Sequence, residues 1–507
     1  MKHAVLHSRR ARYGGLTVSL TAALIAALVL LNVIFFTLAK RFSWFIDMTP
    51  DKVYSVSEMC HELIEQTLRD AADEGEQPHV EVIFCEDYRT YAPGSSGAYI
   101  VNTVNELVAR HPDAIELRWF DCFLDVSQAR ELGVTNSTNI VIRAQNGEKR
   151  VLYQQEFFTF EGGNTTSPVG YDGERVIATT LSSLLRADRP LACLTLNHDE
   201  RFYDQTLVFL LRDAGYTVSL IDLYYESVPD ECTLLVVYNP STDFIVSDGI
   251  SQHSELDKLS AHLDKGHDMM VFLSANTPEL PHFESFLSEW GVKVARHADE
   301  TTGHSYSYMV KDASAALTSD GFTIFGAPVT RGAAAELLSP LTGQDFVPGV
   351  VFRDATVLSV ADGFVPEGGS YRRGDRLRHD VFVASDSARA FSSGKQLPDT
   401  PDEMALMTLT ESTTTGARLL TCASTEYAAQ SYLQSAVFGN ADTLLCVLRD
   451  MGMEDVLIGL RYKPFASSTI SSITTVQTTR WTVALTVLPA LCVLTVATII
   501  LVRRKHS

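Results

Sequence analysis

The chain has 507 residues and a formal net charge of −21. That length is too great for a single hydrophobic core, and so acidic a chain is a poor candidate for binding nucleic acid. The eight cysteines form no CxxC pair and no cluster with the spacing of metal ligands. The composition therefore predicts two or three acidic domains, with no metal, no cofactor and no nucleic acid bound.

Two long apolar runs lie near the ends of the chain, at residues 16–38 and 481–502. A helix needs about 20 apolar residues to cross the hydrocarbon core of a bilayer, so each run is long enough for one span. A cleavable signal peptide is the alternative interpretation of the first run. An uncleaved anchor fits better, because the apolar core is longer than that of a signal peptide and the small-residue cleavage pattern near Ala39 is poor.

Basic residues lie outside both runs, with Arg9 and Arg10 before the first and Arg503 and Arg504 after the second. Because Lys and Arg are retained on the cytoplasmic side, both termini are expected in the cytoplasm. The sequence therefore predicts a two-pass protein of the plasma membrane, in contact with the lipid bilayer, whose large middle part lies outside the cytoplasm. The predicted segments are a cytoplasmic tail (1–15), a transmembrane helix (16–38), a membrane-proximal helical stem (39–78), a first α/β unit (79–187), a second α/β unit (188–296), an irregular mixed region that returns to the core (297–463), a tether (464–480), a transmembrane helix (481–502) and a cytoplasmic tail (503–507).

The stem and the first α/β unit show helical and strand-like patterns in alternation. Ser55-x-x-Glu58 resembles a capping box, and apolar residues then recur every four positions as in an amphipathic helix. Strands separated by helices favour a mostly parallel sheet. Strands are expected at 79–85, 114–120, 139–144 and 150–153, with helices beginning near Ile100 and at 174–186.

The second α/β unit has the most regular pattern in the chain. Strands are expected at 191–196, 216–221, 234–238, 269–273 and 291–294, with helices at 201–214, 255–264 and 283–290. This alternation predicts a doubly wound, mostly parallel sheet. From 297 to 415 the pattern weakens into Ser, Thr, Gly and Asp, with short strand-like pieces at 350–352 and 355–360. A buried strand is expected at 418–422, a helix at 441–451 and a strand at 456–461.

One group of polar residues follows the first strand of the second unit. Asn197, His198, Asp199 and Glu200 lie at the carboxyl end of that strand, and Asn239 follows the strand at 234–238. Doubly wound sheets bind ligands at this edge, so these five residues are the candidate ligand or partner contact. An imidazole beside carboxylates can bind a metal or act as a general base, but a contiguous set on a turn diverges, and His198 can equally hydrogen-bond its loop to the next helix.

The order of several motifs resembles the GldG-like auxiliary subunits of ABC transporters, a family named from a gliding-motility-associated transport system. The segments that carry the resemblance are Asp47–Ser57 (DMTPDKVYSVS), Leu191–Glu200 (LACLTLNHDE), Leu210–Pro240 (LLRDAGYTVSLIDLYYESVPDECTLLVVYNP), Phe438–Asp442 (FGNAD), and Arg461–Lys463 together with the basic end of the chain. The family's "GHGE"-type turn has Asn197 and Asp199 in place of its glycines. Since Asn and Asp tolerate left-handed backbone best after Gly, the turn is expected to survive.

The resemblance implies a non-ATPase subunit that sits beside an ABC-2-type permease and a separate cytosolic ATPase. The chain itself has no G-x-x-x-x-G-K-[ST] phosphate loop. It also has no G-x-S-x-G nucleophile elbow. The sequence thus predicts a non-enzymatic auxiliary subunit that binds or gates cargo or braces the permease; the alternative is an exported α/β hydrolase or amidotransferase-like enzyme.

Overall fold

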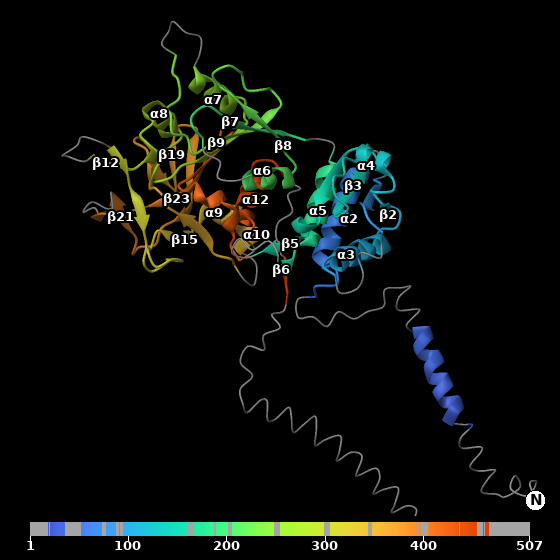
Figure 1. The fold of residues 1–507 in the computed structure, drawn as a ribbon. Helices are drawn as coiled ribbons and strands as arrows, with labels where there is room; N and C mark the ends of the chain where they lie inside the picture. The colour runs from blue at the N-terminus through green and yellow to red at the C-terminus, as the bar shows by residue number, and fades with distance from the viewer. Residues whose placement is uncertain are drawn as a thin grey trace, which may run out of the picture. The chain divides into compact units, whose positions relative to one another are not determined.

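A computed structural model describes most of the middle of the chain. The described residues are 19, 21–35, 52–73, 78–87, 91, 95–160, 167–186, 189–200, 205–247, 254–298, 305–342, 347–392, 395–396, 404–435, 437–453, 460 and 462–465. The chain divides into one compact unit of residues 1–464 and another of residues 465–507. All the elements described below belong to the first unit (Figure 1).

The prediction of a two-pass plasma-membrane protein with an extracytoplasmic domain is contradicted. Among the residues that the structure describes, no helix is both long enough and apolar enough to cross a membrane. In the first apolar run the described helix covers residues 21–35. The second run, 481–502, the end of the tether and both tails lie outside the described residues.

The first α/β region contains the expected strands and helices, but its sheet is not mostly parallel. The strand order is β2-β1-β3-β4, and only β1 and β2 run parallel. β3 and β4 are joined by a short turn that contains Gly147 (φ 88°), and strands connected so tightly must be antiparallel. The elements are β1 (Val80–Phe84), α3 (Gly97–Arg110), β2 (Ile115–Trp119), α4 (Val126–Leu132), β3 (Asn139–Ala144), β4 (Lys149–Tyr153) and α5 (Gly173–Leu185).

The amphipathic helix after the first apolar run is confirmed as α2 (Glu58–Asp73), but its cap is not Ser55. The backbone N–H of Cys60 donates to Oγ of Ser57 at 3.2 Å, which makes Ser57 the capping residue. The backbone N–H of Ser57 donates in turn to Glu174 at 2.8 Å. A tertiary partner on α5 therefore positions the start of α2 two residues later than the local pattern predicts.

Glu174 also joins the two ends of the first compact unit. Lys463 donates to the Glu174 carboxylate and to the backbone carbonyls of Lys52 (3.0 Å) and Ser55 (2.5 Å). The side chains of Lys463 and Glu174 are 13% and 6% exposed. A buried carboxylate is costly unless it is paired, and here Lys463 and Ser57 supply its partners. The entry to α2 and the last described strand, β25 (Lys463–Pro464), thus depend on one ion pair.

We expect Lys463→Met to lower the free energy of unfolding by about 3 kcal/mol, because it leaves the buried Glu174 without its cation. Urea denaturation of the variant and the wild type measures this difference. Lys293→Met is the matched control, since Lys293 pairs with Asp362 on the surface, where both side chains are more than half exposed. Equal stability of the two variants would contradict a stabilising role for the Lys463–Glu174 pair.

The second α/β region contains the parallel sheet that the sequence predicts. Neighbouring strands run parallel in the order β8-β7-β9-β10-β24. The chain starts at β7 and adds β8 on one side of it. It then crosses to the other side of β7, where it adds β9, β10 and β24. Figure 1 shows α7 and α8 together on one side of this sheet and α6 and α12 on the other. The elements are β7 (Leu191–Thr195), α6 (Thr206–Asp213), β8 (Thr217–Ile221), β9 (Cys232–Tyr238), α7 (Glu255–Asp264), β10 (Asp268–Phe272), α8 (Pro281–Glu289), β11 (Val292–Val294) and β24 (Arg418–Cys422).

The region from 297 to 463 extends the same sheet with antiparallel strands. β23 pairs with β24, β20 with β23, and β15 with β20, and one hydrophobic core runs from Ala192 to Met453. The expected strand at 418–422 and helix at 441–451 are confirmed, whereas most of the expected strand at 456–461 lies outside the described residues. The remaining elements are η2 (Gln154–Phe157), β5 (Phe158–Phe160), β6 (Pro168–Tyr171), β12 (Arg296–Ala298), β13 (Ser305–Ser307), β14 (Met309–Lys311), β15 (Thr323–Pro328), α9 (Gly332–Leu337), α10 (Ser339–Thr342), β16 (Val350–Arg353), β17 (Leu358–Val360), β18 (Val365–Glu367), β19 (Ser370–Arg373), β20 (Arg376–Val383), β21 (Arg389–Ser392), β22 (Lys395–Gln396), β23 (Ala405–Ser412), η3 (Glu426–Ala428), α11 (Gln430–Leu433) and α12 (Asn440–Asp450).

The sequence pattern missed β20 because this strand buries a charged residue. Arg378 is fully buried, and its guanidinium donates to Asp380 (2.7 Å) and to the carbonyls of Gly291 (2.8 Å) and Leu358 (3.2 Å). These bonds tie β20 to the segments around β11 and β17. A buried arginine of this kind breaks the alternation of apolar and polar residues by which a strand is recognised in sequence.

Arg378→Met is expected to lower the free energy of unfolding by about 3–5 kcal/mol, because Asp380 and two buried carbonyls lose their donor. The exposed Arg373 of neighbouring β19 provides the control, and Arg373→Met should leave the urea midpoint close to that of the wild type. An Arg378→Met protein as stable as the control would show that apolar packing alone fixes β20.

Candidate functional site

The candidate site lies at the carboxyl ends of β7 and β9, where the direction of chain progression across the sheet reverses. In open α/β sheets the strand ends diverge at such a point and leave a crevice in which ligands bind. The loop after β7 carries Asn197 (φ 75°) and Asp199 (φ 54°), and the loop after β9 carries Asn239 (φ 52°). Asn197 and Asp199 therefore take left-handed backbone, as the sequence analysis expects at these two positions.

Backbone hydrogen bonds join these two loops. The carbonyl of His198 accepts from the N–H groups of Ser241 (2.7 Å) and Thr242 (3.1 Å). The hydroxyl of Thr242 donates to Asp199 at 3.1 Å. Asn239 is buried, and its backbone N–H donates to the carbonyl of Phe272 on β10 at 2.8 Å. The loops after β7 and β9 thus form one structure at the reversal point.

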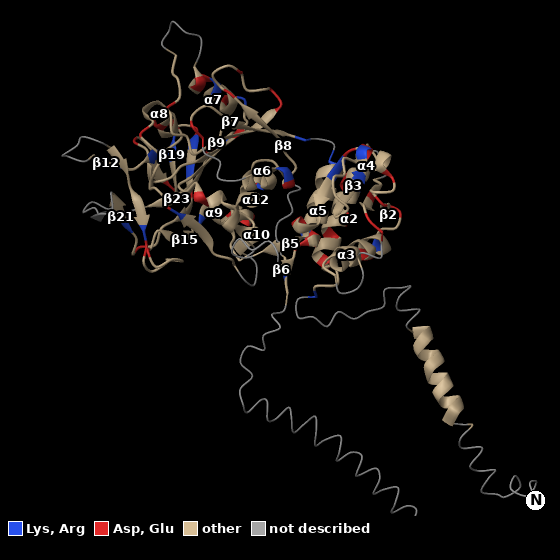
Figure 2. Ribbon diagram, in the orientation of Figure 1, with Lys and Arg blue, Asp and Glu red and all other residues tan. Residues whose placement is uncertain are grey.

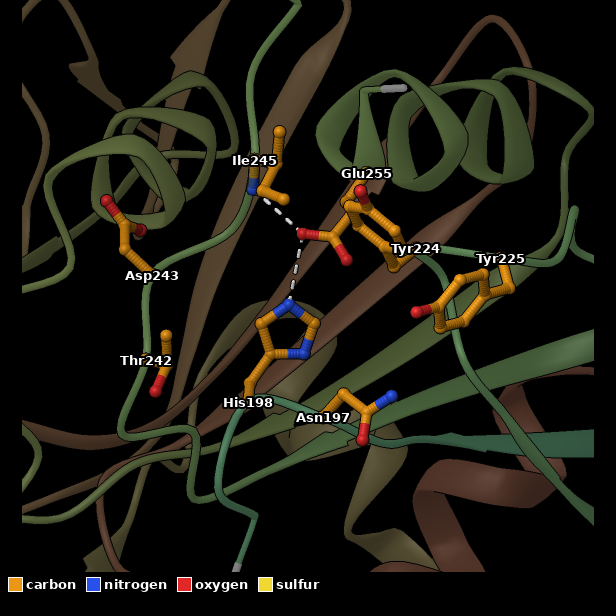
Figure 3. A pocket seen from close by; sticks show the side chains of 8 residues that line it. All are labelled: Asn197, His198, Tyr224, Tyr225, Thr242, Asp243, Ile245 and Glu255. Carbon is orange, nitrogen blue, oxygen red and sulfur yellow. Dashed lines mark hydrogen bonds and ion pairs between the residues drawn. The ribbon is translucent and has the colours of Figure 1, made fainter. Parts of the chain in front are cut away.

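His198 lies between two carboxylates. Its Nδ1 is 3.2 Å from Oε1 of Glu200, and its Nε2 is 3.1 Å from Oε2 of Glu255 (Figure 3). All three side chains are less than 5% exposed, and the imidazole ring stacks on Phe244 with centroids 3.8 Å apart. Ionised carboxylates only accept hydrogen bonds, so this arrangement favours an imidazole with a proton on both nitrogens and a positive charge. We call His198, Glu200 and Glu255 the histidine clamp.

Each glutamate of the histidine clamp has further donors. Glu200 accepts from the backbone N–H of His198 (2.7 Å) and from the hydroxyl of Thr195 (2.9 Å). Glu255 accepts from the backbone N–H of Ile245 at 2.8 Å. It is the first residue of α7, where the helix dipole favours a negative charge. The clamp therefore joins the loop after β7, the loop after β9 and the start of α7.

Hydrogen bonding overcomes burial in setting the charges of the clamp. Burial disfavours the charged imidazole, but the hydrogen bonds to Glu200 and Glu255 outweigh it and raise the pKa of His198 above its usual 6.5. Burial would also raise the pKa of Glu200, yet the hydrogen bonds from His198 and from the backbone outweigh it and lower that pKa below its usual 4.5. Hydrogen bonding therefore favours the charged form of both groups.

A cavity of about 330 Å³ lies beside the clamp. Tyr224 and Tyr225, which follow β8, form one wall, and Asn197 donates from its amide to Asp222 in the same loop. Figure 3 shows the side chains that line the cavity, which are Asn197, His198, Tyr224, Tyr225, Thr242, Asp243, Ile245 and Glu255. Asp243 is engaged elsewhere, because it accepts from the backbone N–H groups of His282 (2.9 Å) and Phe283 (3.1 Å) at the start of α8.

The histidine clamp engages both imidazole nitrogens of His198. A general base or a metal ligand needs a free imidazole nitrogen, and both nitrogens of His198 are held by the clamp. Within the described part of the chain, no three acidic, histidine or cysteine side chains are placed to hold a metal ion. The geometry agrees with the alternative reading of His198, in which it hydrogen-bonds its loop to a neighbouring helix. That helix is α7 rather than the next helix along the chain.

The structure brings all five predicted residues to one edge of the sheet, but of the five only Asn197 and His198 line the cavity. Asn197 and His198 line the cavity, Asp199 and Glu200 brace the turn behind it, and Asn239 supports the neighbouring loop without lining the cavity. Sequence reasoning missed the other six lining residues, which are Tyr224, Tyr225, Thr242, Asp243, Ile245 and Glu255. Position in the sequence could have indicated three of them, because Tyr224 and Tyr225 follow an expected strand and Glu255 begins an expected helix of the same α/β unit.

No model of a known protein family matches the chain, and no curated protein resembles it in sequence. Solved structures do show a distant likeness. The structure titled "mmIFT52 N-terminal domain" aligns with a TM-score of 0.36 and 15% identity, covering 53% of this chain and all of that one. PurLQS from Thermotoga maritima aligns with a TM-score of 0.26 and 14% identity, covering 52% and 98%. The cytoplasmic protein STM3548 from Salmonella typhimurium aligns at 0.26 and 8%, covering 51% and 98%. Nothing about function follows from likenesses this low.

His198→Gln should destabilise the protein in a pH-dependent way. Because the pKa of His198 is raised on folding, its contribution is fully present below pH 6.5 and is lost as the pH rises through the folded-state value. The pKa of Glu200 is lowered, so its contribution is present above pH 4.5 and is lost as the pH falls. The difference between wild type and variant should therefore be largest between pH 4.5 and 6.5, at about 3 kcal/mol for two charged hydrogen bonds.

Urea denaturation at a series of pH values measures this difference. His282→Gln is the control, since the His282 side chain, in the first turn of α8, is 57% exposed. A stability difference for His198→Gln that stays flat from pH 5 to pH 9 would contradict a charged imidazole in the clamp.

Proposed function

We propose that this chain is a non-ATPase auxiliary subunit of an ABC-type transport system, and that it acts by binding a partner rather than by catalysis. The observation that carries the non-catalytic part is the histidine clamp, which occupies both nitrogens of His198, the best catalytic candidate in the chain. The transport role rests on the resemblance of the sequence to GldG-like subunits. In this proposal the partners are an ABC-2-type permease and a separate cytosolic ATPase.

Features of two resembling segments support the proposal. The turn at 197–200 keeps a left-handed backbone at both positions where the family has glycine, so its shape is compatible with the family's turn. The segment at 438–442 begins α12, and its Asn440 is fully buried, exchanging hydrogen bonds of 2.8 Å with the backbone of Val351 on β16. We assign the first segment to the partner-binding edge and the second to holding α12 against the sheet.

Charge also favours a protein partner over nucleic acid. The chain carries a net charge of −21, and Figure 2 shows acidic residues interspersed with basic ones rather than a continuous basic stripe along the described elements. Proteins that bind nucleic acid concentrate Lys and Arg on one face to contact phosphates. In the proposal the two α/β regions form the partner-binding part, and the cavity at the carboxyl edge of the large sheet is its contact.

Affinity purification of the tagged full chain from native cells in mild detergent tests the proposal. We expect an ABC permease and its ATPase to co-purify with the wild type. Ile245→Ser should reduce their yield severalfold, because it removes a 40%-exposed apolar side chain from the wall of the cavity. Val437→Ser, at a 58%-exposed position outside the cavity, is the matched control and should leave the yield unchanged.

Recovery of the intact wild type without any ABC component would overturn the transport role. If the ABC components co-purify equally with wild type and Ile245→Ser, the partner contact lies elsewhere on the chain. The melting temperature of each variant is measured in parallel, so that a folding defect is not mistaken for a lost contact.

A further inference from the structure

The large sheet ends at β8 (Thr217–Ile221), an edge strand that pairs with β7. Much of this strand lies at the surface, because Thr217, Ser219 and Leu220 are all exposed, the Leu220 side chain by 56%. An edge strand presents one row of backbone N–H and C=O groups to whatever lies beside the sheet. The exposed side of β8 is therefore a surface on which a further strand can pair.

The register of β8 on β7 determines which backbone groups point outward. The N–H of Thr217 donates to the carbonyl of Pro190 at 2.9 Å. The carbonyl of Ile221 accepts from the N–H of Leu196, also at 2.9 Å. Hydrogen bonds along a strand alternate between its two sides, so positions 217, 219 and 221 bond toward β7 and positions 218 and 220 point away from it.

Val218 and Leu220 thus supply the outward donors and acceptors of β8. The hydroxyl of Ser219 is 3.5 Å from the Leu220 carbonyl, a long hydrogen bond. A carbonyl oxygen has two lone pairs, so this bond is compatible with a second donor from a neighbouring strand. The outward side of β8 can therefore take part in a regular ladder.

The residues of β8 do not discourage such pairing. Natural edge strands are protected by charged side chains, proline or bulges. At the three other ends of the two largest sheets, β2 carries Glu116 and Arg118, β4 carries Lys149 and Arg150, and β16 ends in Arg353. β8 (TVSLI) carries neither a charge nor a proline. Its composition favours pairing where the other three edges oppose it.

An antiparallel copy of β8 complements this edge, because the outward positions are symmetric about Ser219. When Ser219 faces Ser219 of a second copy on a two-fold axis, Val218 of each chain faces Leu220 of the other. Each of these two pairs exchanges both of its backbone hydrogen bonds. The exposed Leu220 side chain then lies beside an apolar valine, and the two serine hydroxyls meet across the axis. No charge of β8 meets a like charge, since the strand has none.

We propose that two copies of this chain associate through β8, paired antiparallel about Ser219, so that their large sheets join into one. The contact is isologous, as in most protein dimers. An edge of five residues buries little surface, and two chains of charge −21 repel each other, so the dimer is a weak one. The inference goes beyond the proposed function and does not rest on it, because it concerns this chain alone.

Disulfide crosslinking of the purified full chain in mild detergent tests the register. In the proposed pair the Cα atoms of the two Ser219 residues are about 4.5 Å apart, within the range of a disulfide. Ser219→Cys should therefore form a reducible dimer under mild oxidation. Thr217→Cys is the matched control on the same exposed strand, and it should stay monomeric because the two copies of position 217 are about 14 Å apart. The wild type, whose described cysteines are buried, gives the background.

Sedimentation velocity over a range of protein concentrations measures the association itself. The wild type should dimerise with a dissociation constant on the order of 10–100 µM. Leu220→Glu should weaken dimerisation by about tenfold or more, because it places two carboxylates beside the two-fold axis. Val365→Glu adds the same charge at a 60%-exposed position of β18, and this matched control should dimerise as the wild type does.

Three results would each overturn the inference. They are a wild type that stays monomeric up to about 500 µM, equal crosslinking of Ser219→Cys and Thr217→Cys, and equal dimerisation of Leu220→Glu and Val365→Glu. The melting temperature of each variant is measured in parallel. The cysteine variants change one exposed side chain each, so they decide the register even if Leu220→Glu is destabilised.

Discussion

The arrangement of the site depends on one buried charge, the imidazolium of His198. It has two carboxylate partners, and these belong to segments far apart in the sequence, since Glu200 follows β7 and Glu255 begins α7. A buried ion is tolerated only when it is paired and its remaining hydrogen-bonding groups are satisfied. Satisfying His198 therefore requires the loop after β7, the loop after β9 and the start of α7 to come together.

The same principle recurs at two other places in the fold. Glu174 is buried where the entry to α2 meets the last described strand, and Lys463 supplies its cation. Arg378 is buried where β20 passes the segments around β11 and β17, and Asp380 supplies its anion. In each case a charged group fixes the relation between segments that apolar packing would leave free to slide, because hydrogen bonds have direction and apolar contacts do not.

These buried charges also explain why the sequence predicts some strands and helix boundaries correctly and misses others. The strands at 191–196 and 269–273 were predicted because continuous apolar runs are typical of a parallel sheet with both faces covered. β20 was missed because Arg378 and Asp380 occupy inward positions, where a polar residue is usually taken as a sign of a loop. The cap of α2 was misplaced for a related reason, since Glu174, distant in sequence, binds Ser57 and overrides the local pattern at Ser55. The length of an apolar run predicted membrane spans, and the described helices do not provide them.

For the candidate site, the sequence predicted which edge of the sheet carries the polar residues, but not how their side chains interact there. His198 and its neighbours were found because parallel strands place their carboxyl ends together, and topology is read from element order. Which nitrogen of His198 meets which carboxylate depends on the start of α7, which lies close in space but far in sequence. The sequence likewise does not show that Tyr224 and Glu255 line the same cavity. Their proximity depends on how β8 and α7 are placed on either side of the reversal point. A free imidazole would have favoured chemistry at this edge. A clamped one makes His198 a fixed support that holds the loop after β7 against the start of α7, beside the cavity.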